Sequence, residues 1–139
     1  MLSYVCVGTN DLPRAIRFYT AAFAPLAMPR CATGDPEWDR ISAGWGTYKN
    51  GGAEEFAFWV GTPFDKRDAS VGNGSMIAFH ATSWQAVDEF HAAALAHGGS
   101  SEGAPGLRAH YAADFYAAYV RDPDGNKLCA VSRGFTARS

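Results

Sequence analysis

His80 is the residue of this chain best suited to acid–base chemistry. It closes the apolar run that begins at Met76, and the two residues have the same strand parity, so they would share one face of a strand. An imidazole in a cleft can act as a general base or hydrogen-bond a ligand. The alternative is a partly buried histidine with a backbone partner, since the ring serves either role. His80 is the one candidate catalytic residue, and both interpretations stay open.

The three cysteines, Cys6, Cys31 and Cys129, give an odd count without a C-x-x-C spacing. This pattern argues against a disulfide framework or a structural zinc site and favours free thiols in a reducing cytoplasm. The sequence also has no G-x-S-x-G elbow, no P-loop and no G-x-G-x-x-G pattern. We therefore expect a cytoplasmic protein with no cofactor.

Residues suited to binding are more numerous than residues suited to catalysis. Arg108 lies in a Gly- and Pro-containing segment, 100–114, where it can pair with an anionic ligand or remain exposed without one. Aromatic side chains can line an apolar cleft for a planar or hydrophobic small molecule, or they can pack in the core and in a dimer interface. The aromatic candidates are Tyr4, Trp45, Phe58, Trp59, Tyr116 and Tyr119.

Charge and hydropathy exclude other partners. The formal net charge is -2 and there is no basic stretch, so nucleic acid is not an expected partner. No apolar run approaches the ~20 residues that span a bilayer, and the first eight residues do not resemble a secretory signal.

Asp122-Pro123-Asp124-Gly125 lacks the further oxygen ligands of a calcium loop, and it is typical of a hairpin turn with Gly125 at positive φ.

The chain reads as two similar halves. In the first, a strand over residues 2–8 precedes a helix capped by Asp11, followed by two or three antiparallel strands over 38–60 with a turn at 49–52. In the second, a strand over 76–80 and a helix from Ser83 to Gly98 precede an irregular segment and a hairpin of strands 115–121 and 127–132.

An offset of 72 residues superposes the halves, and FYTAAF in the first answers FHAAAL in the second. Two copies of a βαβββ unit are the simplest explanation. We therefore predict an α+β fold in which paired βαβββ modules form an open, curled mixed sheet. The single domain, 1–139, would comprise module 1 (about 1–61), a linker (62–75) and module 2 (about 76–133).

Three stretches carry a resemblance to a known family. They are Val7–Tyr19, with its strand-to-helix entry and F-Y pair; Tyr119–Leu128, with D-P-D-G-N; and Gly72–Phe79. The chain resembles the vicinal oxygen chelate superfamily, which includes glyoxalases such as lactoylglutathione lyase, bleomycin resistance proteins and extradiol dioxygenases. This resemblance implies a ligand cleft between two modules and a homodimer.

Enzymes of that family hold a divalent metal with four side chains, usually His and Glu. The resemblance places these positions at Tyr4, Met76, Cys129 and either Phe58 or Trp59. None is a histidine or a carboxylate, so no metal site is expected. The ligand-binding residues predicted together are Tyr4, Trp45, Phe58, Trp59, Met76, His80, Arg108, Tyr116 and Cys129.

The missing ligands favour a metal-independent protein that binds a small apolar or aromatic molecule in the cleft between modules. Bleomycin resistance members of the family act by sequestration and need no catalytic metal. The alternative is an enzyme of the same superfamily, either a glyoxalase-type lyase or isomerase or a dioxygenase. It would depend on a metal or use His80 as acid and base.

Overall fold

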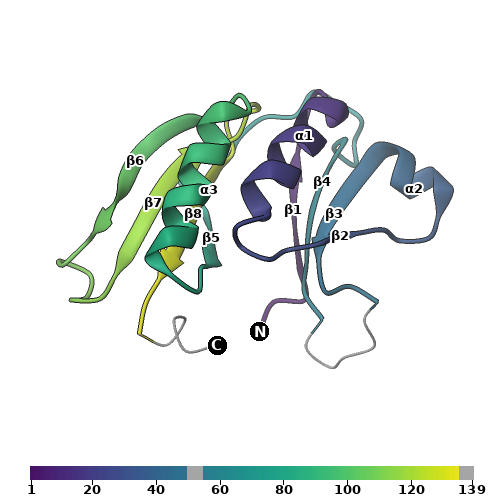
Figure 1. Ribbon diagram of the computed structural model, residues 1–139. Helices are drawn as coiled ribbons and strands as arrows, with labels where there is room; N and C mark the ends of the chain where they lie inside the picture. Colours follow the sequence, from purple (N-terminus) through teal and green to yellow (C-terminus); the bar gives the residue numbers. More distant parts are fainter. Residues whose placement is uncertain (50–54, 135–139) are drawn as a thin grey trace.

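The computed structural model describes residues 1–49 and 55–134 (Figure 1). The first half contains β1 (Tyr4–Gly8), α1 (Leu12–Phe23), β2 (Arg30–Cys31), α2 (Pro36–Ile41), β3 (Ser42–Gly46) and β4 (Ala57–Gly61). The second half contains β5 (Ile77–His80), α3 (Trp84–Ala96), β6 (Ser100–Leu107), β7 (Tyr116–Arg121) and β8 (Lys127–Ser132). Most of the turn predicted at 49–52 lies outside the described residues.

The two halves have the same sheet topology. Each forms a four-stranded mixed sheet, ordered β1-β4-β3-β2 in the first and β5-β8-β7-β6 in the second. β1 pairs with β4 in parallel and β5 with β8 in parallel, whereas the remaining pairs are antiparallel. The predicted α+β fold of paired βαβββ modules is confirmed, with two separate open sheets. Helices α1 and α3 lie side by side between the sheets (Figure 1).

Both long helices begin where the sequence predicts. The Asp11 carboxylate accepts a hydrogen bond from the backbone N–H of Arg14 at 3.1 Å and caps α1. The Ser83 hydroxyl accepts one from the N–H of Ala86 at 3.1 Å and caps α3. These side chains satisfy backbone N–H groups that a helix leaves unpaired in its first turn.

Three segments differ from the prediction, and one of them is the two-residue strand β2, which was not expected. A short helix, α2, occupies residues where a strand was expected from Arg40, because Asp35 caps it and Pro36 is preorganised for its first turn. β6 is a strand where an irregular excursion was expected. It tolerates Pro105 because it lies at the sheet edge, and its pairing with β7 shifts register twice.

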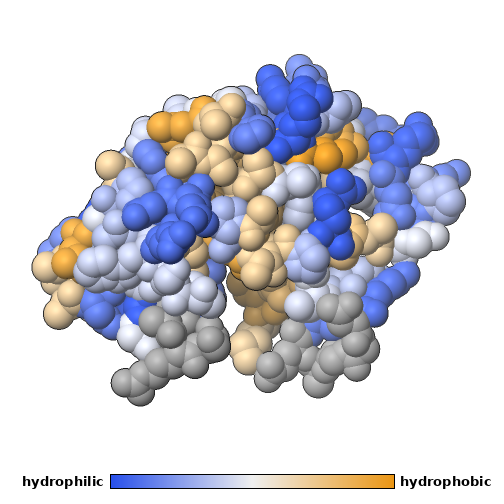
Figure 2. Space-filling model, viewed as in Figure 1, coloured by the Kyte–Doolittle hydropathy of each residue, from blue (hydrophilic) through white to orange (hydrophobic). Residues whose placement is uncertain are grey.

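One hydrophobic core joins the modules. Phe23 of α1 contacts Phe58 of β4 at a ring-centroid distance of 5.4 Å and Phe79 of β5 at 4.9 Å. All three rings belong to the same buried cluster. In the surface view, apolar residues run down the middle of the face where the two halves meet (Figure 2). Among the described residues, no helix has the length and apolar character needed to cross a membrane.

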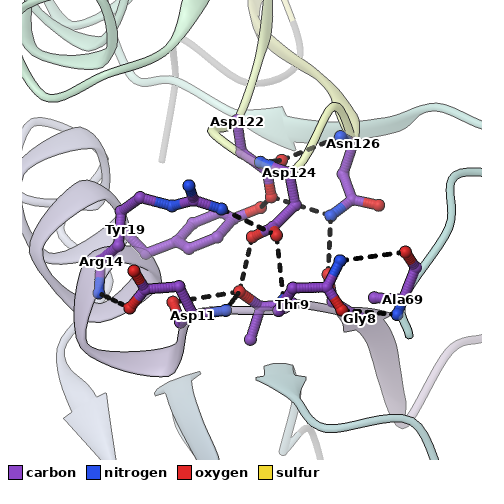
Figure 3. A network of polar contacts seen from close by, with 10 residues as sticks. Gly8, Thr9, Asp11, Arg14, Tyr19, Ala69, Asp122, Asp124 and Asn126 are labelled. Atoms are coloured by element: carbon purple, nitrogen blue, oxygen red, sulfur yellow. Dashed lines mark hydrogen bonds and ion pairs between the residues drawn. The ribbon is translucent and has the colours of Figure 1, made fainter. Parts of the chain in front are cut away.

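A polar network joins the same two modules on one side of this core (Figure 3). The hairpin between β7 and β8 supplies two aspartates, and Gly125 has the expected positive φ, 96°. Asp124 accepts hydrogen bonds from the Thr9 hydroxyl at 2.5 Å and the Asn10 N–H at 2.9 Å, and it forms a 3.0 Å ion pair with Arg14. The Asp122 carboxylate accepts one from the hydroxyl of buried Tyr19 at 2.5 Å. The D-P-D-G turn therefore connects module 2 to the entry of α1.

The Tyr19 hydroxyl makes the stability of the protein sensitive to alkaline pH. Burial, and then the charge of Asp122, raises the pKa of Tyr19 well above its ordinary value. Because the folded-state pKa exceeds the unfolded one, about 10, the contribution of this hydroxyl is fully present below that pH. It is lost as the pH rises through the folded-state value. We expect the free energy of unfolding to fall above pH about 10, and to fall less in Tyr19→Phe, when measured by urea denaturation.

Tyr111→Phe is the matched control, because Tyr111 is exposed. Its alkaline profile should follow that of the parent protein. An equally steep alkaline loss in Tyr19→Phe would show that another group is responsible.

Candidate binding site

Each sheet has a face turned toward the helices and an outer face. Val5 and Val7 of β1 pack against the core, so the alternating residues Tyr4 and Cys6 point to the outer face. The register of β1 with β4 places Trp59 opposite Cys6. Trp59 is therefore the β4 aromatic that shares the outer face with Tyr4, a choice that the sequence left open between positions 58 and 59.

Two predicted ligand-binding aromatics lie in the core instead. Trp45 is 1% exposed and Phe58 is completely buried, and the two are paired across β3 and β4. Both rings contact Tyr19 of α1, at centroid distances of 5.5 and 5.1 Å. The strict alternation of strand side chains explains the correction, because facing Trp59 outward turns Phe58 and its partner inward.

Tyr116 is also turned away from the outer face. Its ring stacks on Trp84 of α3 with centroids 4.4 Å apart, and its hydroxyl donates to the Asp88 carboxylate at 2.6 Å. Its strand neighbours Ala118 and Val120 on the same face belong to the core between β7 and the helices. The structure thus places this tyrosine on the helix side, where it packs with α3.

A pocket of about 440 Å³ lies on the outer face of module 1. Cys6 and Trp59 form part of its wall, and Trp38 of α2 together with Asp65 and Asp68 of the linker encloses it. The Trp59 indole lies flat over Gly44: a Cβ atom added there would sit 2.3 Å from the ring. Tyr4 is 64% exposed, two residues before Cys6 on β1.

A larger groove, about 850 Å³, lies on the outer face of module 2. We call it the module 2 groove and define it by the residues that line it: Asn73, Gly74, Ser75, Met76, Glu102, Gly103, Arg108, His110, Tyr111, Phe115, Tyr119, Arg121, Lys127 and Arg133. Among the ligand-binding residues predicted from sequence, Met76 and Arg108 are brought together here. The volume is within the ~300–1,000 Å³ typical of small-molecule sites.

Tyr119 was an aromatic candidate that was left out of the predicted ligand-binding residues, and Lys127, Phe115 and Arg133 were not predicted at all. Cys129 was predicted to face the site, and strand alternation from Cys129 places Lys127 on the same face of β8. Tyr119 pairs directly with Cys129 across β7 and β8 and faces the same way. Phe115 and Arg133 lie just outside β7 and β8, where strand parity offers no guide.

Cys129 lies beneath the groove and does not line it. It is 1% exposed, and burial raises the pKa of its thiol to about 11. The thiol therefore stays protonated near neutral pH, whereas nucleophilic attack needs the thiolate.

His80 stands apart from both hollows. It is exposed at the end of β5, opposite Val131 of β8, and it lines neither the module 1 pocket nor the module 2 groove. The shared parity with Met76 holds, but the groove ends at Met76 and does not extend along β5 to the histidine.

The positions that the family resemblance assigns to metal ligands do not suit a divalent cation. Tyr4, Trp59, Met76 and Cys129 offer two aromatic rings, a thioether and one buried thiol, with no imidazole and no carboxylate. Magnesium and calcium require oxygen ligands, and zinc or iron sites use imidazole, carboxylate or thiolate. In residues 1–49 and 55–134, no group of three or more His, Cys, Asp or Glu side chains could hold a metal ion.

The fold and its two hollows define a class of protein: a pair of βαβββ modules with a small-molecule-sized hollow on the outer face of each sheet. The sequence model of the Glyoxalase/Bleomycin resistance protein/Dioxygenase superfamily matches residues 1–130. The chain therefore belongs to that superfamily, and the resemblance stated from the sequence is confirmed.

Solved structures agree with this assignment. A glyoxalase/bleomycin resistance protein from Albidiferax ferrireducens T118 is 37% identical, with a TM-score of 0.78 over 96% of this chain and 98% of that chain. A glyoxalase/bleomycin resistance protein/dioxygenase family enzyme from Burkholderia phytofirmans PsJN shares the fold at 17% identity and a TM-score of 0.66, over 94% and 97% of the chains. A lactoylglutathione lyase from Agrobacterium tumefaciens also shares the fold. It is 17% identical, with a TM-score of 0.61 over 95% of this chain and 92% of that chain. The comparison with curated proteins gave no match.

Proposed function

We propose that this protein binds a small apolar or aromatic molecule on the outer faces of its modules, and that binding requires no metal ion. The observation that carries the proposal is the chemistry of the four positions where a metal-dependent relative would hold its ion. They are occupied by Tyr4, Trp59, Met76 and Cys129. None of these is an imidazole or a carboxylate, and the first three offer aromatic or apolar surface, whereas Cys129 is buried. Such surface with few polar groups suits a hydrophobic or planar ligand.

We further propose that the protein is a homodimer and that the ligand lies between outer faces of modules brought together in the dimer. Tyr4 and Met76 support this arrangement, because they leave 64% and 45% of their surfaces exposed on the outer faces of β1 and the start of β5. Apolar side chains exposed on a sheet face are common where another chain packs. Sedimentation equilibrium tests the dimer, and the mass of a single chain would contradict it.

A cytoplasmic location is part of the same proposal. Its support is that Cys6, Cys31 and Cys129 are all free thiols, as is usual in a reducing compartment.

Two expectations follow from the proposal that the protein binds a ligand without a metal, and both can be tested on the same purified samples. Metal analysis of the purified protein should find less than stoichiometric zinc, nickel or iron. A thermal-shift screen of small aromatic compounds should find stabilising ligands whose effect is unchanged by a chelator, because a ligand that binds only the folded state raises its stability.

The enzyme alternative predicts the opposite results. It would be supported by tightly bound stoichiometric metal, or by turnover of the methylglyoxal–glutathione hemithioacetal with or without added nickel or zinc. His80→Ala separates the metal-free version of that alternative, since it should abolish turnover if the imidazole is the acid and base. Either form of turnover would retire the binding proposal.

A further inference from the structure

We propose that the module 2 groove selects planar aromatic ligands that carry a negative charge, such as an aromatic carboxylate. This inference rests on the proposed function and names the class of ligand for one of its sites. It depends on three features of the groove: an excess of positive charge, an arginine held in place by the backbone, and an aromatic wall beside that arginine.

The excess of positive charge is the first feature. Among the described residues that line the groove, Arg108, Arg121 and Lys127 carry positive charge against a single carboxylate, Glu102. Glu102 is already paired with Arg121 at 2.6 Å, and this arginine holds the pKa of the carboxyl below its ordinary value. The chain as a whole has a net charge of -2, so the groove concentrates positive charge on a slightly acidic protein.

Two backbone carbonyls hold Arg108 in place. Its Nη1 donates to the Gly106 carbonyl and its Nη2 to the Ala104 carbonyl, each at 2.8 Å. Two of its five N–H groups are used in this way, and among the described residues it forms no ion pair. The remaining donors are available to an anion, and a planar guanidinium matches a carboxylate in a bidentate arrangement.

Glycines make room for this guanidinium. A Cβ atom added at Gly103 would lie 3.1 Å from Nη2 of Arg108, and one added at Gly106 would lie 3.2 Å from Nη1. Both contacts are tighter than side chains ordinarily make. The glycine-rich strand β6 therefore lets Arg108 lie close against the backbone, so that a ligand does not have to immobilise a long free side chain.

The aromatic wall lies beside these cations. The Tyr119 ring has the Arg108 guanidinium 5.5 Å from its centroid and the Lys127 ammonium 5.8 Å away. Phe115 packs against Tyr111 with centroids 5.1 Å apart, and the Arg133 guanidinium lies 5.3 Å from the Phe115 ring. A ligand ring can stack against these aromatic side chains while its anionic group pairs with Arg108 and Lys127. An uncharged ligand can stack in the same way but cannot form the ion pairs.

Matched carboxylate and carboxamide probes test the inference. Binding of 2-naphthoate and 2-naphthamide, benzoate and benzamide, and indole-3-carboxylate and indole-3-carboxamide would be measured by isothermal titration calorimetry on the full chain. Each carboxylate should bind at least about tenfold more tightly than its amide, because charge-assisted hydrogen bonds are about twice as strong as neutral ones. Raising the salt concentration should narrow the difference.

Substitutions in the groove test whether its side chains cause the preference for carboxylates over carboxamides. Arg108→Gln should weaken 2-naphthoate binding about tenfold and leave 2-naphthamide within about twofold. Lys127→Gln should act in the same direction and serves if Arg108→Gln does not fold. Arg17→Gln is the matched control, because Arg17 is exposed on α1, and it should change neither affinity.

The outcomes separate this inference from the proposed function. If amides bind as tightly as carboxylates, or if both groove variants bind 2-naphthoate as the parent does, the charge preference is refuted and the binding function stands. If no member of any pair binds, the inference and the proposed function for this groove fail together.

Discussion

Replacing Phe23 by alanine is expected to lower the free energy of unfolding by about 3–5 kcal/mol, the range found for large aromatic residues removed from a core. Phe23 is completely buried on α1 and contacts Phe58 of module 1 and Phe79 of module 2. Its loss opens a cavity where the modules meet, so neither module can relax into it alone. Urea denaturation followed by tryptophan fluorescence measures the change, with Trp45 5.8 Å from the Phe23 ring as a nearby reporter.

Phe64→Ala is the matched control for this prediction. Phe64 is 92% exposed in the linker, so the same chemical change there should alter stability by no more than about 0.5 kcal/mol. If Phe23→Ala is too unstable to purify, Phe23→Leu should show a smaller loss in the same direction. A loss of less than about 1 kcal/mol in Phe23→Ala would mean that the modules are not held by a shared core.

The fold was predictable because its signals repeat. Asp11 and Ser83 cap equivalent helices 72 residues apart, and a duplicated pattern is stronger evidence than any single strand or helix. The elements that escaped prediction are α2 and the two edge strands, β2 and β6. β6 contains four residues of low strand propensity, Gly103, Ala104, Pro105 and Gly106, and becomes a strand because β7 supplies a partner.

The site was only partly predictable, because strand side chains alternate between the two faces of a sheet. Trp59 and Phe58 are adjacent aromatics, so a one-residue difference in strand phase decides which faces a ligand and which enters the core. The sequence does not fix that phase until β1 and β4 are paired. Arg108 was identified as an anion-binding candidate, but the carbonyls that position it lie on β6, which ends one residue before it, and depend on the bulged backbone of that strand.

Replacing Asp122 by alanine is expected to cost about 3 kcal/mol, because it leaves one buried and three partly buried hydrogen-bond donors without their acceptor. The Asp122 carboxylate accepts from the Tyr19 hydroxyl at 2.5 Å, from Asn126 Nδ2 at 2.9 Å, and from the backbone N–H groups of Asp124 at 3.0 Å and Asn126 at 2.8 Å. The Tyr19 hydroxyl is the costliest loss, since its ring is completely buried and water cannot replace the carboxylate.

A double-mutant cycle tests whether the lost hydrogen bond of the Tyr19 hydroxyl is the main reason that Asp122→Ala lowers stability. Tyr19→Phe removes the donor, so Asp122→Ala should cost less in the Tyr19→Phe background than in the parent, with a coupling of about 1–3 kcal/mol. Asp68→Ala provides the control, because Asp68 is exposed in the linker and should change stability by under about 0.5 kcal/mol. Additive costs would show that the two side chains act independently, and that the contact between α1 and the β7–β8 turn contributes little to joining the modules. A coupling of the expected size would mean that the D-P-D-G turn, which the sequence presents as a simple hairpin, also stabilises the association of the two halves.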